Sequence, residues 1–254
     1  MFDKRCGEWE YGVGGGVVWD STVEGEYEEC RTKAAVLLNP TPDFKLLETI
    51  RWSPDEGFFL LDRHLARLQD SAEYFDYDVR IQDVRNALEA AVMDCSQIPK
   101  RVRLLADAQG RIEVEVLEFT PWKEGGELSV ALAVNPVDPK DRFLYHKTTR
   151  REVYEAAHVE HPDCDEVLLW NPDGFVTEGT RSNVAVEMDG KLWTPPVSCG
   201  LLPGTLRARM LEAGELVERL IRVEDLDRVG AIYLLNSLRG MARARLVQRI
   251  AARV

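Results

Sequence analysis

Two proline-rich breaks divide this chain into parts and limit how it can fold. Asn39-Pro-Thr-Pro42 and Asn135-Pro-Val-Asp-Pro139 each hold two prolines within five residues. Proline lacks a backbone N–H donor and fixes φ, so neither stretch can continue a helix or a central strand. The sequence therefore predicts an amino-terminal segment, a linker, a smaller domain, a second linker and a larger domain over residues 1–36, 37–42, 43–134, 135–140 and 141–254.

Charge and hydropathy exclude several classes of protein. The chain has 32 lysines and arginines against 44 aspartates and glutamates, a net charge of −12 that disfavours nucleic acids and anionic membranes as partners. No apolar stretch approaches the roughly 20 residues that cross a bilayer. The first residues lack the apolar region of a secretory signal, so we expect a cytoplasmic location. The five cysteines form no CxxC pair and the four histidines no HExxH motif, so we expect no disulfide framework and no metal site.

Apolar periodicity predicts helices and strands in both domains. Apolar residues at steps of three and four over residues 61–75 indicate a helix, and alternation over 101–107 and 112–118 indicates a hairpin. The other predicted elements are strands at 44–52 and 58–61, a helix at 81–95, a strand at 128–134, a helix at 147–159, strands at 167–170 and 174–177, two strands within 182–193, a helix at 203–213 and a strand at 231–235. The predicted fold class is α/β (α+β), with a ligand site in the cleft between two unequal domains.

Two ionisable residues stand where predicted elements begin or end. Lys147 lies in an arginine-rich stretch at the start of a predicted helix. Burial beside cations would lower the pKa of its amine, and the neutral amine could attack an aldehyde. The alternative is an ordinary lysine exposed to solvent. Glu178 follows a short strand, where its carboxylate could hold a protonated ring nitrogen or simply accept from the amides of a turn.

Backbone amides at two other places could bind an anion. Thr205 and Leu206 follow a Pro-Gly pair and open a predicted helix, whose first amides have no partner within the helix. Ser237 and Leu238 follow an apolar strand. Arg67 lies beside the apolar stripe of the helix at 61–75, so it could reach inward to the same anion or extend into solvent.

The order and spacing of these residues along the chain resemble those of class IV pyridoxal-phosphate enzymes over residues 43–254. The motifs are His64-Leu-Ala-Arg67, Lys147, Glu178-Gly-Thr-Arg-Ser-Asn183, Leu192-Trp-Thr194 and Leu202-Pro-Gly-Thr-Leu-Arg207, with Ala185 where the family usually has an aromatic residue. The resemblance implies the two-domain type IV fold, like that of D-amino-acid aminotransferase, with pyridoxal 5'-phosphate as cofactor. It implies that Lys147 holds the cofactor covalently and that Glu178 keeps its ring nitrogen protonated. The remaining cofactor-binding residues that it implies are Arg67, Asn183, Thr205, Leu206, Ser237 and Leu238.

Within that family the chain is similar to aminodeoxychorismate lyase. The residues concerned are Leu47-Glu-Thr-Ile-Arg51, Lys147-Thr-Thr149 and Asn236-Ser-Leu-Arg-Gly240. The similarity implies a small-molecule substrate, 4-amino-4-deoxychorismate, which loses pyruvate to give 4-aminobenzoate for folate biosynthesis, and it implies a homodimer. Lys147 and Thr49 are the implied catalytic residues, and Arg239, Arg51 and Arg150 are candidates for the substrate carboxylates. A branched-chain or D-amino-acid aminotransferase of the same family is the alternative, because it would use the same cofactor residues.

Residues 1–36 resemble the closing segment of aminodeoxychorismate synthase component I. The similarity covers the glycine-rich stretch from Gly12 to Ser21 and the acidic run that follows it, read as a strand, an Asp or Ser cap and a helix. In that family the glutamates of this helix bind magnesium, so Glu26 and Glu29 are expected to be idle unless another chain completes the domain. We therefore expect a truncated remnant, and a non-catalytic docking module for a synthase subunit is a second alternative.

Overall fold

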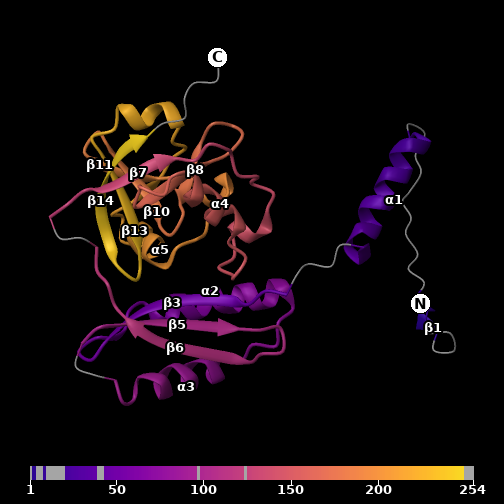
Figure 1. Cartoon of the computed structure of the whole chain (residues 1–254), viewed down its shortest axis with the longest axis horizontal. Helices are drawn as coiled ribbons and strands as arrows, with labels where there is room; N and C mark the ends of the chain where they lie inside the picture. Colours follow the sequence, from indigo (N-terminus) through magenta and orange to yellow (C-terminus); the bar gives the residue numbers. More distant parts are fainter. Residues whose placement is uncertain are drawn as a thin grey trace. The chain divides into compact units, whose positions relative to one another are not determined.

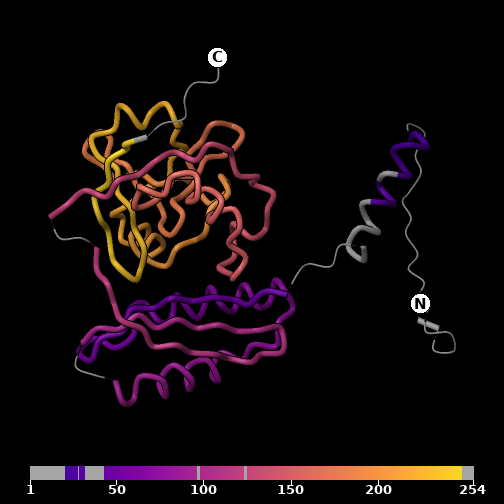
Figure 2. Tube along the Cα trace, viewed as in Figure 1, coloured from indigo at the N-terminus to yellow at the C-terminus, as the bar shows by residue number. Residues whose placement is uncertain are grey.

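The computed structural model describes residues 2–3, 8–9, 21–38, 43–95, 98–122 and 125–248 of the chain. Residues 1–43 and residues 44–254 form two compact units, the amino-terminal unit and the main unit. Figure 2 traces the chain through both units. The stretch Gly12–Gly16, the strand expected near residues 17–19 and residues 39–42 of the first break lie outside the described residues.

The described residues of the amino-terminal unit form two short paired strands and a helix. Strand β1 (Phe2–Asp3) pairs antiparallel with β2 (Glu8–Trp9), and helix α1 spans Val23–Leu38. The Thr22 hydroxyl accepts from the N–H of Gly25 at 3.1 Å, so the cap lies one residue later than the expected Asp or Ser. Residues 37 and 38, expected in the linker, are helical because no proline interrupts the helix before position 40.

A four-stranded antiparallel sheet forms the first part of the main unit. Its strands are β3 (Leu46–Ser53), β4 (Gly57–Phe58), β5 (Lys100–Ala106) and β6 (Ile112–Glu118), in the order β4-β3-β5-β6. Helices α2 (Leu61–Phe75) and α3 (Ile81–Val92) pack on it. Helix α3 ends before the expected Cys95, and β4 ends earlier than expected because the chain turns at Leu60, with φ of 55°, to begin α2.

Side-chain alternation gives this smaller sheet an apolar face and a polar face. The side chains that face α2 and α3 are mostly apolar and include Leu46, Ile50, Val102 and Leu104, with the buried carboxylate of Glu48 as the exception. Successive side chains of a strand point to opposite faces, so Thr49, Arg101 and Arg103 lie on the other face. Thr49 and Arg103 are direct partners in the β3–β5 register. The smaller sheet thus presents polar groups on the side away from its helices.

An eight-stranded mixed sheet forms the rest of the main unit (Figure 1). Its order is β12 (Val217–Glu218), β11 (Lys191–Thr194), β10 (Asn183–Met188), β13 (Ala231–Asn236), β14 (Gly240–Gln248), β7 (Leu128–Leu132), β8 (Glu166–Trp170) and β9 (Val176–Gly179). Helices α4 (Glu152–Glu160) and α5 (Thr205–Glu212) accompany it, with single 3-10 turns at Arg142–Leu144, Val197–Cys199 and Val223–Asp227. No helix among the described residues is long and apolar enough to cross a membrane.

Strand β7 corrects the expected boundary between the domains. It was expected to end the smaller domain at residue 134, but it pairs in parallel with β14 and β8 in the larger sheet. Leu128, Val130 and Leu132 are buried in the core of that sheet, which explains why the strand belongs there. The chain therefore passes between the sheets after β6, ahead of the second proline break.

The segment around Lys147 is extended, although a helix was expected there. The N–H of Leu47 donates to the Lys147 carbonyl at 2.9 Å, and the N–H of Thr149 donates to the Lys45 carbonyl at 2.9 Å. Because β3 and Lys45 just before it supply these backbone partners, the segment needs no helical hydrogen bonds, and α4 begins only at Glu152. These bonds join a segment of the larger part of the main unit to the smaller sheet.

Candidate active site

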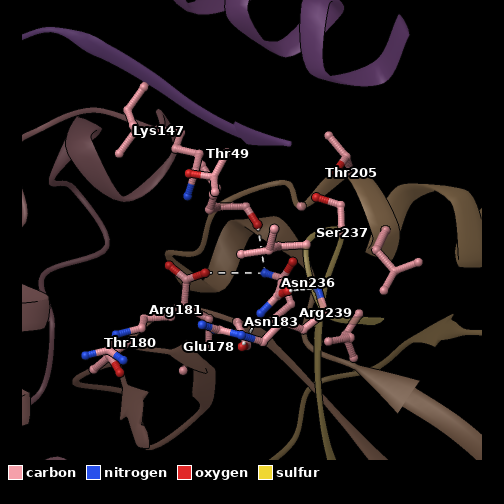
Figure 3. A pocket seen from close by; sticks show the side chains of 18 of the residues that line it. Thr49, Lys147, Glu178, Thr180, Arg181, Asn183, Thr205, Asn236, Ser237 and Arg239 are labelled. Carbon is pink, nitrogen blue, oxygen red and sulfur yellow. Dashed lines mark hydrogen bonds between the residues drawn. The ribbon is translucent and has the colours of Figure 1, made fainter. Parts of the chain in front are cut away.

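A cavity of about 440 Å³ in the main unit is lined by residues from both sheets (Figure 3). This volume suits a small ligand. Ten of the twelve residues expected in the site line it, namely Thr49, Arg67, Lys147, Glu178, Asn183, Thr205, Leu206, Ser237, Leu238 and Arg239. The structure thus brings these residues together, while their individual roles remain predictions.

Two of the expected arginines lie elsewhere. The guanidinium carbon of Arg51 is 4.3 Å from the centre of the Phe59 ring. That of Arg150 is 4.6 Å from the Phe143 ring, and its Nε lies 3.6 Å from a carboxylate oxygen of Glu152. Aromatic faces and carboxylates attract guanidinium groups, so these contacts hold both side chains away from the cavity. Arg51 and Arg150 therefore do not line the cavity, where the resemblance implied a role for them in binding the substrate.

Sequence reasoning missed several polar residues that line the cavity, namely Arg101, Arg103, Arg151, Arg181 and Tyr154. The first two alternate with buried Val102 and Leu104, so the strand pattern could have placed them together on the open face. No comparable signal marks Tyr154, because its place on α4 gives no hint of what faces it.

Lys147 has a lowered pKa. Burial lowers the pKa of its amine from 10.5 to about 8, helped by the positive charges of Arg67 and Arg151 and opposed by Glu48 and Glu178. A lysine in this environment carries a larger neutral fraction at physiological pH than an exposed one, and only the neutral amine is nucleophilic or basic. The site therefore holds an amine suited to attack a carbonyl or to remove a proton.

Glu178 is a buried carboxylate at the end of β9. The Tyr154 hydroxyl donates to Oε1 at 2.8 Å, and Nδ2 of Asn183 donates to Oε2 at 3.3 Å. Burial nevertheless raises the pKa of Glu178 to about 8, since desolvation outweighs these hydrogen bonds. A cationic ring N–H beside it would stabilise the ionised form.

The N-terminus of α5 forms another part of the wall. Its cap residue Gly204 supplies no side-chain hydrogen bond, so no capping side chain accepts from the first amides, at Thr205 and Leu206. A Cβ atom at Gly204 would lie only 1.9 Å from Oδ1 of Asn183, so the chain passes closer here than any larger residue allows. These features suit an anion approaching the helix end.

A buried network supports the anion-binding groups from behind. Arg67 donates to both oxygens of Glu48, from Nε at 2.8 Å and from Nη2 at 2.6 Å. Nδ1 of His64 lies 2.6 Å from Glu48 Oε2, and its Nε2 lies 3.3 Å from the Thr205 hydroxyl. The charges and hydrogen bonds of Arg67 and His64 lower the pKa of Glu48 to about 2, against the opposing effect of burial. Because the ionised carboxylate only accepts, it fixes the proton of His64 on Nδ1.

The family follows from a comparison with family models. The model described as amino-transferase class IV matches residues 45–247. The chain belongs to this family. A second model, described as chorismate binding enzyme, matches residues 2–39. Both matches confirm the resemblances found in the sequence, and the class IV match confirms the predicted fold class.

Relatives in this family carry two kinds of name. A Schizosaccharomyces pombe protein that carries the name aminodeoxychorismate lyase is 30% identical over 201 residues, which cover 76% of this chain and 86% of that protein. A Thermotoga maritima protein named for branched-chain-amino-acid aminotransferase is 26% identical over 196 residues, covering 74% and 71%. The names of these relatives therefore do not separate lyase from aminotransferase.

Solved structures share the fold. An amino-acid aminotransferase structure from Mesorhizobium loti superposes with a TM-score of 0.77 at 38% identity, covering 81% of this chain and 100% of that chain. The pyridoxal-phosphate-bound form of a Mycobacterium tuberculosis aminotransferase gives a TM-score of 0.70 at 23% identity, covering 80% and 83%. The second likeness shows the fold alone.

Proposed function

We propose that this chain is a pyridoxal-phosphate-dependent lyase that converts 4-amino-4-deoxychorismate into pyruvate and 4-aminobenzoate. The observation that carries the proposal is one cavity lined by an amine with a pKa of about 8, a buried carboxylate and an uncapped helix N-terminus. These groups complement the aldehyde, the ring nitrogen and the phosphate of the cofactor.

The residues present fit this cofactor. Glu178 is a buried acid, and burial raises its pKa. A protonated pyridine nitrogen beside it would carry the positive charge that stabilises its ionised form. The close approach at Gly204 and the open amides of Thr205 and Leu206 suit a phosphate, with Arg67 beside them. When bound, the cofactor supplies a carbonyl that condenses with amines and a ring that accepts an electron pair.

The amine of Lys147 accepts and donates the protons of the reaction. With a pKa of about 8, roughly a tenth of Lys147 is neutral at pH 7, so Nζ can remove the ring proton next to the reacting nitrogen of the substrate. The C–O bond to the enolpyruvyl group then breaks, the ring becomes aromatic, and the proton on Nζ passes to the leaving group to complete pyruvate. No water or oxidant is consumed, because substrate and products have the same atoms.

Three observations support a lyase. The relative with 30% identity is named for aminodeoxychorismate lyase. The amino-terminal residues match a chorismate-binding family, whose ligand is chemically close to the proposed substrate. Arg239 lines the cavity and could bind a substrate carboxylate. An aminotransferase is the second candidate, favoured by the Mesorhizobium loti structure at 38% identity.

Covalent attachment of the cofactor tests the first half of the proposal. The wild-type protein should shift the absorption of added pyridoxal phosphate and gain its mass after borohydride reduction. Lys147→Ala should do neither, whereas Lys140→Ala, which changes an exposed lysine seven positions earlier, should behave as wild type. Failure of the wild-type protein to attach the cofactor would overturn the proposal.

Two assays then distinguish the reactions. The lyase should release pyruvate and 4-aminobenzoate in equal amounts from 4-amino-4-deoxychorismate. An aminotransferase should instead transfer the amino group of glutamate to a branched-chain keto acid. Keto-acid conversion without pyruvate release would replace the lyase with the second candidate.

A further inference from the structure

Three arginines from different elements line the same cavity. Arg101 comes from β5 of the smaller sheet, Arg181 from the turn between β9 and β10, and Arg239 from the turn between β13 and β14. Among the residues that the structure describes, none of the three forms a salt bridge with a carboxylate. Their positive charges therefore lack a paired counter-charge within the described part of the chain.

Uncharged neighbours hold Arg239, and Arg101 has a buried donor without a partner. Arg239 donates from Nε to the Thr120 carbonyl at 2.9 Å, and its guanidinium carbon lies 4.9 Å from the Trp122 ring. The Nε atom of Arg101 is buried with no hydrogen-bond partner. A buried donor without a partner is costly, and a ligand that accepts from it would remove that cost.

Glu166, a fully buried carboxylate on β8, is already engaged. Its Oε1 accepts from the Ser182 hydroxyl at 2.6 Å, and its Oε2 accepts from the backbone N–H of Arg181 at 2.9 Å. These bonds hold the turn that carries Arg181, whose side chain is exposed and lines the cavity. Glu166 thus positions the turn, and its charge acts on Arg181 and Arg239 from beyond salt-bridge distance.

The charges around the cavity fall into two groups. Those that change the pKa of Lys147 are Arg67, Arg151, Glu48 and Glu178. Those that change the pKa of Arg239 are Arg101, Arg181 and Glu166. The two groups share no member, so the cavity has one region built around the reacting amine and a second region where arginines dominate.

We propose that Arg101, Arg181 and Arg239 form a carboxylate-binding subsite that selects amines carrying a carboxylate remote from the reacting nitrogen. The planar fork of a guanidinium matches a carboxylate, and several together favour a ligand with a localised negative charge. This inference rests on the proposed function and names its substrate class. A branched-chain amino acid carries its carboxylate on the same carbon as the amine, so it has no remote anionic group for this subsite.

Binding of a matched ligand pair tests the subsite without turnover. 4-Aminobenzoate carries a carboxylate across the ring from its amine, and aniline lacks it. We expect the cofactor-loaded wild-type protein to bind 4-aminobenzoate at least tenfold more tightly than aniline. Arg101→Gln, Arg181→Gln and Arg239→Gln should each reduce that preference by about tenfold or more, as expected for a lost hydrogen bond to a charged group.

Two other substitutions provide matched controls. Arg51 lies directly opposite Arg101 in the β3–β5 register but contacts Phe59, and Arg150 contacts Phe143, so Arg51→Gln and Arg150→Gln should keep the preference. If a glutamine variant does not fold, the corresponding Arg→Lys variant retains the charge and should retain part of the preference.

The outcomes separate the subsite from the enzyme. An unchanged preference in all three variants would overturn the subsite while Lys147-dependent cofactor attachment still supported the enzyme. An equal loss in the Arg51 and Arg150 variants would also overturn it, because the effect would then reflect overall charge. Failure of wild-type cofactor attachment would instead overturn the proposed function.

Discussion

Replacing Glu48 by glutamine should lower the free energy of unfolding by about 3 kcal/mol at pH 7. Glu48 is 2% exposed and accepts hydrogen bonds from Arg67 and His64. The fall of its pKa from the usual 4.5 to about 2 corresponds to about 3 kcal/mol, since each tenfold change in proton affinity is worth about 1.4 kcal/mol. Glutamine lacks the charge, so Arg67 would be left with an uncompensated buried charge.

The sign of the pH dependence is fixed by the same pKa. Because the folded pKa lies below the unfolded one, the stabilisation by Glu48 is complete above the unfolded value of 4.5 and is lost as the pH falls toward about 2. The difference between wild type and Glu48→Gln should therefore stay constant from neutral pH to about pH 6 and shrink by about 1 kcal/mol at about pH 4.

Urea unfolding of the cofactor-free proteins measures this difference. The cofactor must be left out, because a ligand that binds only the folded state raises the apparent stability. Glu89→Gln, on the exposed face of α3, is the matched control and should change stability by less than about 0.5 kcal/mol. The reasoning is refuted if Glu48→Gln is as stable as this control at pH 7, or if the difference grows as the pH falls.

Three further predictions concern the groups that line the cavity. Tyr154→Phe removes the hydroxyl that donates to Glu178 at 2.8 Å, and should lower kcat about tenfold in steady-state assays. Gly204→Ala places a Cβ atom 1.9 Å from Oδ1 of Asn183, and should weaken cofactor binding in equilibrium dialysis without abolishing folding, because φ at this position is −66°. The rate of cofactor attachment should rise as the pH increases toward about 8 and level off above it, as the Lys147 amine loses its proton; a flat profile in stopped-flow absorbance would contradict the assigned pKa.

Strong local periodicity explains which elements could be predicted. Helix α2 has the expected bounds, Leu61–Phe75, because its apolar residues repeat at helical spacing and bury one face. The helix expected at 147–159 begins only at Glu152, because residues 147–149 pair with a segment about a hundred residues earlier in the chain. Similarly, a strand was predicted at 128–134, where β7 lies, but its partners β8 and β14 follow it in sequence. Pairing between distant segments leaves little trace in a local pattern.

The arginines show the same limit within the site. Arg51 and Arg101 are direct cross-strand partners, so alternation places both on the open face of the smaller sheet. Arg101 lines the cavity, whereas Arg51 lies over Phe59. The order of motifs identified the residues around Lys147, because those belong to spaced signatures. The motifs could not show which of two arginines on one face lines the cavity, because this depends on which of them has an aromatic ring within reach.

The cavity wall is rich in positive charge although the whole chain is negatively charged, and this difference restricts which ligands can bind. The whole chain carries −12, yet among the described residues the cavity wall holds Lys147 and six arginines against one carboxylate, that of Glu178. Two of these arginines, Arg67 and Arg103, form ion pairs with Glu48 and Glu115, which leaves four arginines and Lys147. A polyanion would meet repulsion over the acidic surface, whereas a small anion that fits inside is surrounded by cations. Desolvated like charges repel strongly, so a neutral ligand would leave that repulsion in place. The arrangement therefore favours a cofactor and a substrate that both bring negative charge into the cavity.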